Sequence, residues 1–164
     1  MNEIMWIIAI IIGVSLFWCF ILKVKKNIDF QRNTGGWKEI EKNAWHGDLN
    51  DFRVFYKNIN QKKIPGVYIH KNLTNGKCYV GQSNNIFERV NREITGKADN
   101  LGCKLLYNDY LKGHEFKIIL IFKKKEYPNL NKMERAYINM YDSCNKGYNR
   151  TYGNDELTGE TIYK

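Results

Sequence analysis

Five residues of this 164-residue chain have types that together could act on a phosphate ester. They are Tyr68, Tyr79 eleven residues later, Arg89 ten residues after that, Glu134, and Asn149 fifteen residues beyond Glu134. Attack on a phosphodiester adds negative charge to its oxygens, so hydrolysis needs a cation and a fixed guanidinium. One carboxylate, together with phosphate oxygens and water, is a sufficient Mg²⁺ site because Mg²⁺ keeps much of its hydration shell.

Each of these residues also has a simpler interpretation. The two tyrosines alternate with aliphatic residues, as aromatic side chains in the core of a strand do. Arg89 fits a solvated helix surface, and Glu134 fits the third position of a capping box that begins at Asn131. Asn149, in a Gly-Tyr-Asn sequence, is a common turn residue. Taken one at a time, the five residues do not decide between catalysis and these simpler roles.

The two tyrosines lie in a pair of short motifs. Gly66-Val67-Tyr68 followed by Tyr79-Val80-Gly81 resembles the paired motif of the GIY-YIG nuclease family, with valine in place of isoleucine in each triplet. The arginine, glutamate and asparagine described above follow in the order that this family shows. The similarity covers about residues 64–153.

This resemblance implies metal-dependent hydrolysis of a phosphodiester in DNA. Glu134 would hold a single divalent cation, Mg²⁺ or alternatively Mn²⁺, and Arg89 would stabilise the phosphate. Tyr68 would be the general base that activates water, with Tyr79 as a hydrogen-bonding partner in the same cluster. Asn149 would orient Glu134 or the scissile phosphate.

A tyrosine base is chemically awkward. Its free pKa is near 10, so at pH 7 only about one part in a thousand is phenolate, and a nearby cation must lower that pKa. The resemblance implies such a cation at Lys71, three residues after Tyr68. Some relatives have a histidine after the arginine-bearing helix, but none occurs here between Arg89 and Gly113. The identity of the general base therefore stays open.

The surrounding pattern predicts the elements that must position these residues. Period-two patterns predict three strands, at 66–70, 77–81 and 116–122, with a tight turn at Asn75-Gly76. Apolar residues at helical spacing predict five helices, at about 37–45, 49–59, 86–94, 101–111 and 131–141. Asp48 is the expected N-cap of the second helix, and Ser83 or Asn84 that of the third. The C-terminal tail, with Gly147-Tyr148-Asn149 and Gly153-Asn154, is predicted to be loop.

The N-terminal segment predicts a membrane span. Residues 4–22 carry no charged side chain and would form a helix about 28 Å long, close to the hydrocarbon thickness of a bilayer. A cleaved signal peptide would need a basic start and a shorter apolar run, and a buried core helix is rarely apolar on every face. Lys23, Lys25 and Lys26 follow the span, which predicts that the rest of the chain is cytoplasmic. Residues 4–22 would then contact membrane lipid.

The remaining chain is strongly basic. The formal net charge of the whole chain is +9, and residues 61–132 hold fourteen basic and six acidic side chains. Such a balance predicts a polyanion as partner, either DNA or anionic lipid. The lysines expected to contact DNA phosphates are Lys62, Lys63, Lys104, Lys112, Lys123, Lys124 and Lys125. For any one of them, a solvated face or attraction to lipid beside the anchor is the alternative.

Composition excludes several classes of protein. Charged residues at 26% and hydrophobic residues at 43% are values of a folded chain and exclude disorder over the whole length. Four scattered cysteines without a C-x-x-C pair argue against a disulfide framework and a structural zinc site, and predict reduced thiols.

Together these features predict an α+β protein: a small three-stranded antiparallel sheet flanked by helices and preceded by one transmembrane helix. The expected organisation is an anchor with its basic flank at 1–26, a linker and two short helices at 27–63, a nuclease domain at 64–153 and a tail at 154–164.

The predicted function is a membrane-anchored DNA endonuclease, with action on incoming phage or plasmid DNA as a hypothesis. The alternatives are an inactive nucleic-acid-binding adaptor and a structural membrane protein whose basic face binds lipid. A homo-oligomer or a membrane partner stays open.

Overall fold

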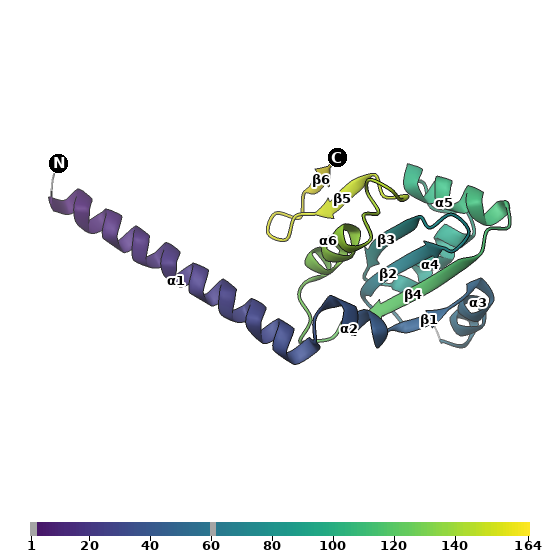
Figure 1. Cartoon of the computed structure of the whole chain (residues 1–164), viewed down its shortest axis with the longest axis horizontal. Helices are drawn as coiled ribbons and strands as arrows, with labels where there is room; N and C mark the ends of the chain where they lie inside the picture. Colours follow the sequence, from purple (N-terminus) through teal and green to yellow (C-terminus); the bar gives the residue numbers. More distant parts are fainter. Residues whose placement is uncertain (1–2, 60–61) are drawn as a thin grey trace. The chain divides into compact units, whose positions relative to one another are not determined.

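The structure is a computed structural model that describes residues 3–59 and 62–164. The chain divides into an N-terminal unit that ends at Gly36 and a second unit over Trp37–Lys164 (Figure 1).

The N-terminal unit is one long helix, α1, over Glu3–Thr34. The apolar side chains that the structure describes between Trp6 and Ile28 are exposed, whereas Phe30 is buried. The stretch Ile8–Gln31 is long and apolar enough to cross a membrane by length and composition. The prediction of a linker from residue 27 was wrong, because residues 27–34 contain no glycine or proline and continue the helix. Gly35 and Gly36 have positive φ angles of 62° and 84°, and they end the helix.

The second unit is built on a four-stranded antiparallel sheet in the order β1-β4-β2-β3. The strands are β1 at Trp45–Gly47, β2 at Gly66–Asn72, β3 at Cys78–Ser83 and β4 at Phe116–Phe122. The last three confirm the predicted strands, and β1 corrects the prediction of a three-stranded sheet. Residues 37–45 have helical spacing, but α2 stops at Lys42 and the chain then pairs with β4, Trp45 opposite Leu120.

The hairpin of β2 and β3 sets the register of the paired motifs. Tyr68 lies opposite Gly81, and His70 lies opposite Tyr79. The predicted turn is confirmed, with Gly76 at a φ of 75° that favours glycine. Since β3 is an edge strand of the sheet, residues on both of its faces lie at the same border of the fold.

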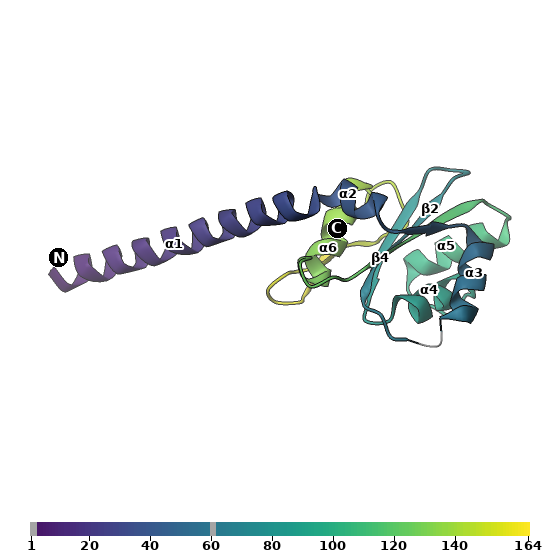
Figure 2. The same ribbon diagram turned by 90° about the horizontal axis from the view of Figure 1, so that it is seen from below.

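Helices cover both faces of the sheet, as Figure 2 shows. On one face lie α3 at Leu49–Asn58, α4 at Ile86–Ile94 and α5 at Leu101–Leu111. On the other face lie α2 at Trp37–Lys42 and α6 at Leu130–Met140. The predicted cap Asp48 is confirmed, since its carboxylate accepts from the amides of Asn50 and Asp51. The caps of α4 and α6 are Asn85 and Asn129, one or two residues from the predicted ones.

The core is continuous between the first face and the sheet. Phe52 of α3, Phe87 of α4 and Leu106 of α5 are buried against Tyr68 and Leu120 of the two central strands.

The C-terminal tail corrects a further prediction. It forms a small hairpin of β5 at Thr151–Asn154 and β6 at Thr161–Tyr163 instead of the predicted loop.

Candidate active site

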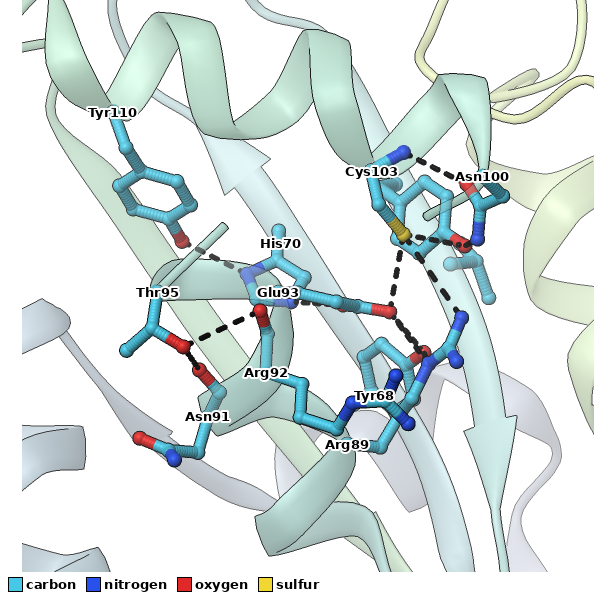
Figure 3. Close-up of polar contacts among 12 residues, drawn as sticks. Tyr68, His70, Arg89, Asn91, Arg92, Glu93, Thr95, Asn100, Cys103 and Tyr110 are labelled. Carbon is cyan, nitrogen blue, oxygen red and sulfur yellow. Dashed lines mark hydrogen bonds and ion pairs between the residues drawn. The ribbon is translucent and has the colours of Figure 1, made fainter. Parts of the chain in front are cut away.

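Tyr68 is the best-anchored of the predicted site residues. It lies on the central strand β2, is 1% exposed, and faces α4. Its hydroxyl donates a hydrogen bond to Glu93 Oε1 at 2.7 Å and accepts one from Arg89 Nε at 3.2 Å (Figure 3). The structure thus brings two of the five predicted residues, Tyr68 and Arg89, into direct contact.

At both motif glycines, Gly66 and Gly81, atoms of another residue lie where a side chain would begin. A Cβ added at Gly81 would lie 2.2 Å from the Tyr68 hydroxyl oxygen, so this hydroxyl occupies the space where a side chain would otherwise be. A Cβ at Gly66 would lie 2.3 Å from the carbonyl oxygen of Ile121 on the neighbouring strand β4. The glycines therefore permit the strand packing and the tyrosine position that the site needs.

Tyr79 lies beside Tyr68, with ring centroids 6.4 Å apart. Its hydroxyl is 3.3 Å from Cys103 Sγ and accepts a bond from Asn100 Nδ2 at 3.4 Å, both on or next to α5. The 7% exposed side chain is part of the same core as Tyr68. The structure thus places Tyr79 in the same cluster as Tyr68, with its hydroxyl directed to Asn100 and Cys103.

Arg89 projects from α4 across the border of the sheet. Its Nε donates to Glu93 Oε1 at 2.9 Å, an i,i+4 ion pair, while 30% of its side chain is exposed. Burial alone would lower the pKa of Arg89, but the interactions with Tyr68 and Glu93 outweigh it and raise that pKa. The guanidinium is thus fixed at Nε, its Nη2 lies 3.9 Å from Cys103 Sγ, and it stays partly exposed, an arrangement suited to an anionic ligand.

The electrostatics of Tyr68 do not favour a standing phenolate. Burial raises the pKa of Tyr68 well above its ordinary value, the charge of Glu93 raises it further, and Arg89 lowers it by less. Burial and Glu93 raise the pKa of Tyr79 in the same way. The phenols are therefore protonated in the structure as it stands.

Lys71 is not brought to Tyr68. Successive residues of a strand point to opposite faces, so residues 68 and 71 of β2 face different layers. The Lys71 ammonium lies over the ring of Tyr141, 6.0 Å from its centroid, on the α6 side of the sheet. The expectation that Lys71 lowers the pKa of Tyr68 is therefore corrected.

Glu134 reaches the same border from the other face, on α6. Its Oε2 accepts a hydrogen bond from Gln82 Nε2 of β3 at 3.0 Å. Burial raises the pKa of Glu134 to about 7, against the lowering effects of Gln82 and of Arg89. The cap of α6 is Asn129, which accepts from the Lys132 amide, so Glu134 does not close a capping box.

The surroundings of Glu134 fit a hydrated Mg²⁺ ion. Oδ1 of Asn131 lies beside the carboxylate as a second possible oxygen ligand, since Gln82 Nε2 donates hydrogen bonds to both of them. A Cβ at Gly153 would come to 3.2 Å from Glu134 Oε2, so the glycine keeps that side of the carboxylate open. Among the residues that the structure describes, His, Cys, Asp and Glu form no metal-binding group of three or more. A cation here would therefore be held by one protein carboxylate, with water and phosphate completing its shell.

Asn149 bonds the backbone of the edge strand. Its Oδ1 accepts from the Val80 amide at 2.8 Å and its Nδ2 donates to the Val80 carbonyl at 2.8 Å. The side chain is 6% exposed. These bonds occupy both of its functional groups and fix the strand that carries Tyr79 and Gly81.

Sequence reasoning missed the buried partners of Tyr68 and Arg89. Glu93 of α4 and His70 of β2 are 0% exposed and 3.0 Å apart, and the Tyr110 hydroxyl lies 2.8 Å from the far ring nitrogen of His70. A signal was present: Glu93 lies three residues after Val90 and seven after Ile86, on the apolar face of its helix. A carboxylate on such a face needs a partner.

The predicted DNA-contacting lysines differ in their surroundings. Lys123 is engaged by carbonyls of its own loop, including that of Tyr127 at 2.9 Å, and Lys112 pairs with Asp109 at 3.1 Å. Lys124 lies over the Tyr127 ring, 5.6 Å from its centroid. The exposed members of the set are Lys62, Lys63, Lys104, Lys112, Lys124 and Lys125.

Comparison with known proteins adds one finding. The model of the GIY-YIG catalytic domain matches residues 64–149, just over half of the chain. No curated protein matches, and neither does any solved structure. The matched range contains both tyrosine motifs, α4 and α6, which are the elements that meet at the border of β3.

Proposed function

Because the chain belongs to the GIY-YIG catalytic-domain family, we propose that it is an endonuclease that hydrolyses phosphodiester bonds in DNA. The family is one of nucleases, and a nuclease domain of this kind implies DNA as the substrate. The observation that carries the proposal is the contact of the Tyr68 hydroxyl with the Arg89 guanidinium, 3.2 Å apart, at the edge of the sheet that Glu134 reaches from its other face.

Arg89 would bind the scissile phosphate. Its Nε is held by Tyr68 and Glu93, so the partly exposed guanidinium has a fixed direction before the substrate arrives. A donor that is already oriented stabilises the extra negative charge of the transition state without reorganising. The surrounding net positive charge would bring the polyanion to the site.

Glu134 would hold a divalent cation, Mg²⁺ with Mn²⁺ as the alternative. When bound there, the cation supplies charge neutralisation at the phosphate oxygens. The chain contributes the carboxylate itself, the Gln82 amide that orients it at 3.0 Å, and the open side at Gly153. Nucleases of this family depend in general on such a cation.

Cleavage of supercoiled plasmid by the purified full chain with Mg²⁺ tests the proposal. Glu134→Gln keeps size and hydrogen bonding but removes the charge that a cation needs, so we expect it to bind DNA without cutting it. Glu115→Gln, a change at an exposed carboxylate before β4, is the matched control and should cut normally. Binding without cleavage by the unaltered chain would support the adaptor alternative, and cleavage by Glu134→Gln at the normal rate would refute the metal site.

We further propose that α1 anchors the nuclease domain to a membrane, with the domain in the cytoplasm. The support is the length and composition of Ile8–Gln31 and the three lysines at 23, 25 and 26 that directly follow the predicted span. An anchored nuclease would meet DNA as it enters the cell, which suits defence against phage or plasmid DNA.

A reporter fused after Lys164 tests this orientation. It should behave as a cytoplasmic protein, and a chain that starts at Trp37 should leave the membrane fraction and still cut DNA, since the site lies in the second unit. A reporter outside the cytoplasm would reverse the topology and indicate an exported nuclease.

A further inference from the structure

Glu93 lies at the centre of the polar network between β2, α4 and α5 (Figure 3). Its side chain is 0% exposed. Oε1 is 2.7 Å from the Tyr68 hydroxyl and 2.9 Å from Arg89 Nε, and Oε2 is 3.0 Å from His70 Nε2. The sulfur of Cys103 is 3.3 Å from Oε1.

Stability alone does not account for a carboxylate in this position. Removing a charge from water costs several kcal/mol, and well-packed apolar residues often replace a buried ion pair without loss of stability. The informative feature is which groups the carboxylate touches. Two of its partners, Tyr68 and Arg89, are the residues that the proposed reaction places at water and at phosphate.

The Tyr68 phenol has a ready acceptor for its proton. A standing phenolate is disfavoured here, because burial and the charge of Glu93 raise the pKa of Tyr68. A phenol that already donates to a carboxylate at 2.7 Å can instead take a proton from water while it gives its own proton away. No phenolate then accumulates, and no lysine beside Tyr68 is needed.

Resting on the proposed nuclease function, we propose that Glu93 is a positioning residue of the hydrolysis: it receives the proton of the attacking water through Tyr68 and directs Arg89 toward the phosphate. In this step one O–H bond of water breaks and its proton moves to the Tyr68 oxygen, while the Tyr68 proton moves to Glu93 Oε1. The water oxygen bonds to phosphorus, the bond from phosphorus to the leaving ester oxygen breaks, and that oxygen takes a proton from solvent. The proton on Glu93 later returns to solvent through Tyr68.

The same transfer couples Glu93 to the charge of Arg89. Before the step, the carboxylate holds Arg89 Nε at 2.9 Å and shares its positive charge. Once Glu93 is protonated, it no longer competes for that charge, just as negative charge grows on the phosphate oxygens. The interaction of Arg89 with phosphate therefore strengthens in the transition state relative to the ground state, which is the requirement for catalysis.

His70 fixes the orientation of this carboxylate. An ionised Glu93 only accepts hydrogen bonds, so His70 Nε2 donates to Oε2 at 3.0 Å, and Nδ1 then accepts from the Tyr110 hydroxyl at 2.8 Å. These two hydrogen bonds keep Oε2 of Glu93 occupied and leave Oε1 for Tyr68 and Arg89. A neutral amide at position 93 also fits, because the imidazole can change tautomer and accept from it.

The matched variants are Glu93→Gln and Glu93→Asp in the full-length protein. The amide keeps size and hydrogen bonding but lacks the charge that accepts a proton, whereas aspartate keeps the charge and is one methylene shorter. We expect Glu93→Gln to lower kcat for plasmid cleavage by about 10²–10³-fold, the scale of losing a proton acceptor, with unchanged DNA affinity. Glu93→Asp should retain more activity than Glu93→Gln.

Glu88→Gln is the control on the same helix. Glu88 is exposed and accepts a hydrogen bond from the Tyr56 hydroxyl at 2.7 Å, so the substitution also removes a tyrosine-bonded carboxylate of α4. It should cut DNA at the normal rate. An equal loss in Glu88→Gln would show a general effect of helix charge and overturn the role of Glu93.

Three further outcomes decide the proposal. Wild-type kcat in Glu93→Gln, or more activity in Glu93→Gln than in Glu93→Asp, would reduce Glu93 to a structural residue. If neither variant folds by circular dichroism, Tyr68→Phe carries the test, because it interrupts the same proton path, and a normal rate there would refute the path. No cleavage by the unaltered chain would instead be a failure of the proposed function.

Discussion

Replacing Gly81 by alanine tests the site without removing any polar group. The added Cβ would lie 2.2 Å from the Tyr68 hydroxyl oxygen and 2.4 Å from the ring carbon that bears it. Since side-chain contacts of this kind are not found below 3.0 Å, the hydroxyl must move away by most of an ångström or more. Its bonds to Glu93 at 2.7 Å and to Arg89 at 3.2 Å cannot both survive that shift.

Two effects of Gly81→Ala follow, on stability and on activity. Overpacking of this kind costs about 1–3 kcal/mol of unfolding free energy. Displacement of Tyr68 should in addition lower the cleavage rate by about two orders of magnitude or more, because a proton-transfer contact is lost. Gly76→Ala separates the two effects. Gly76 has open space around it but a φ of 75°, so alanine costs about 1–2 kcal/mol there and leaves Tyr68 in place.

The assay pairs urea unfolding with plasmid cleavage for both variants. Similar losses of stability are expected, with loss of cleavage in Gly81→Ala alone. Cleavage by Gly81→Ala at the rate of Gly76→Ala would refute the reasoning, because it would mean that the contacts of Tyr68 with Arg89 and Glu93 do not matter for turnover.

Three further predictions concern metal, phosphate and the edge strand. Burial raises the pKa of Glu134 to about 7 without metal, so a proton and the cation compete for its carboxylate near neutral pH. The Mg²⁺ concentration for half-maximal cleavage should therefore be about tenfold higher at pH 6 than at pH 8. An unchanged Mg²⁺ requirement over that range would contradict the prediction. Arg89→Ala should lower the cleavage rate by about two to three orders of magnitude, whereas Lys124→Ala should only weaken binding slightly and reduce its salt slope by about one. Equal small effects would make Arg89 an ordinary backbone contact. Asn149→Ala leaves the buried amide and carbonyl of Val80 without their partners. The free energy of unfolding in urea should therefore fall by about 2–3 kcal/mol. An unchanged unfolding midpoint would show that Asn149 does not stabilise the edge strand.

Elements with strong local patterns were predictable from the sequence. The strand β4 begins and ends at the predicted residues, because six of its seven residues, all but Lys117, are apolar and follow the turn signal at Gly113. The short strand β1 was not predictable, since three residues carry too little periodicity and its pairing with β4 is a tertiary contact. The polar composition of residues 27–34 predicts a linker, but no residue in that segment breaks a helix, and α1 continues to Thr34.

The site shows the same division between local and tertiary information. The alternating pattern and the Asn75-Gly76 turn predicted the pairing of the two strands, and the family resemblance implied Tyr68 and Arg89, which the structure brings together. The position of Lys71 contradicts a role beside Tyr68, and strand alternation already implies this from the sequence. Glu93 was missed because a glutamate on a helix usually faces water, and its burial depends on β2 and α5 lying against the helix.

The edge position of β3 explains how residues from both faces of the sheet can serve one site. Tyr79 and Gly81 point toward α4 and α5, and Gln82 points to Glu134 on α6, so the two layers meet only where the sheet ends. An exposed edge is also a risk, because its unpaired backbone groups invite pairing with another chain. Here Tyr148 donates its amide to the Cys78 carbonyl at 2.9 Å, and the Asn149 side chain bonds the amide and carbonyl of Val80. The Gly-Tyr-Asn segment therefore covers the first half of the edge, next to the hairpin turn. The second half, with Gly81 and Gln82, is where Arg89 and Glu134 converge, and it is there that we expect the DNA backbone to lie.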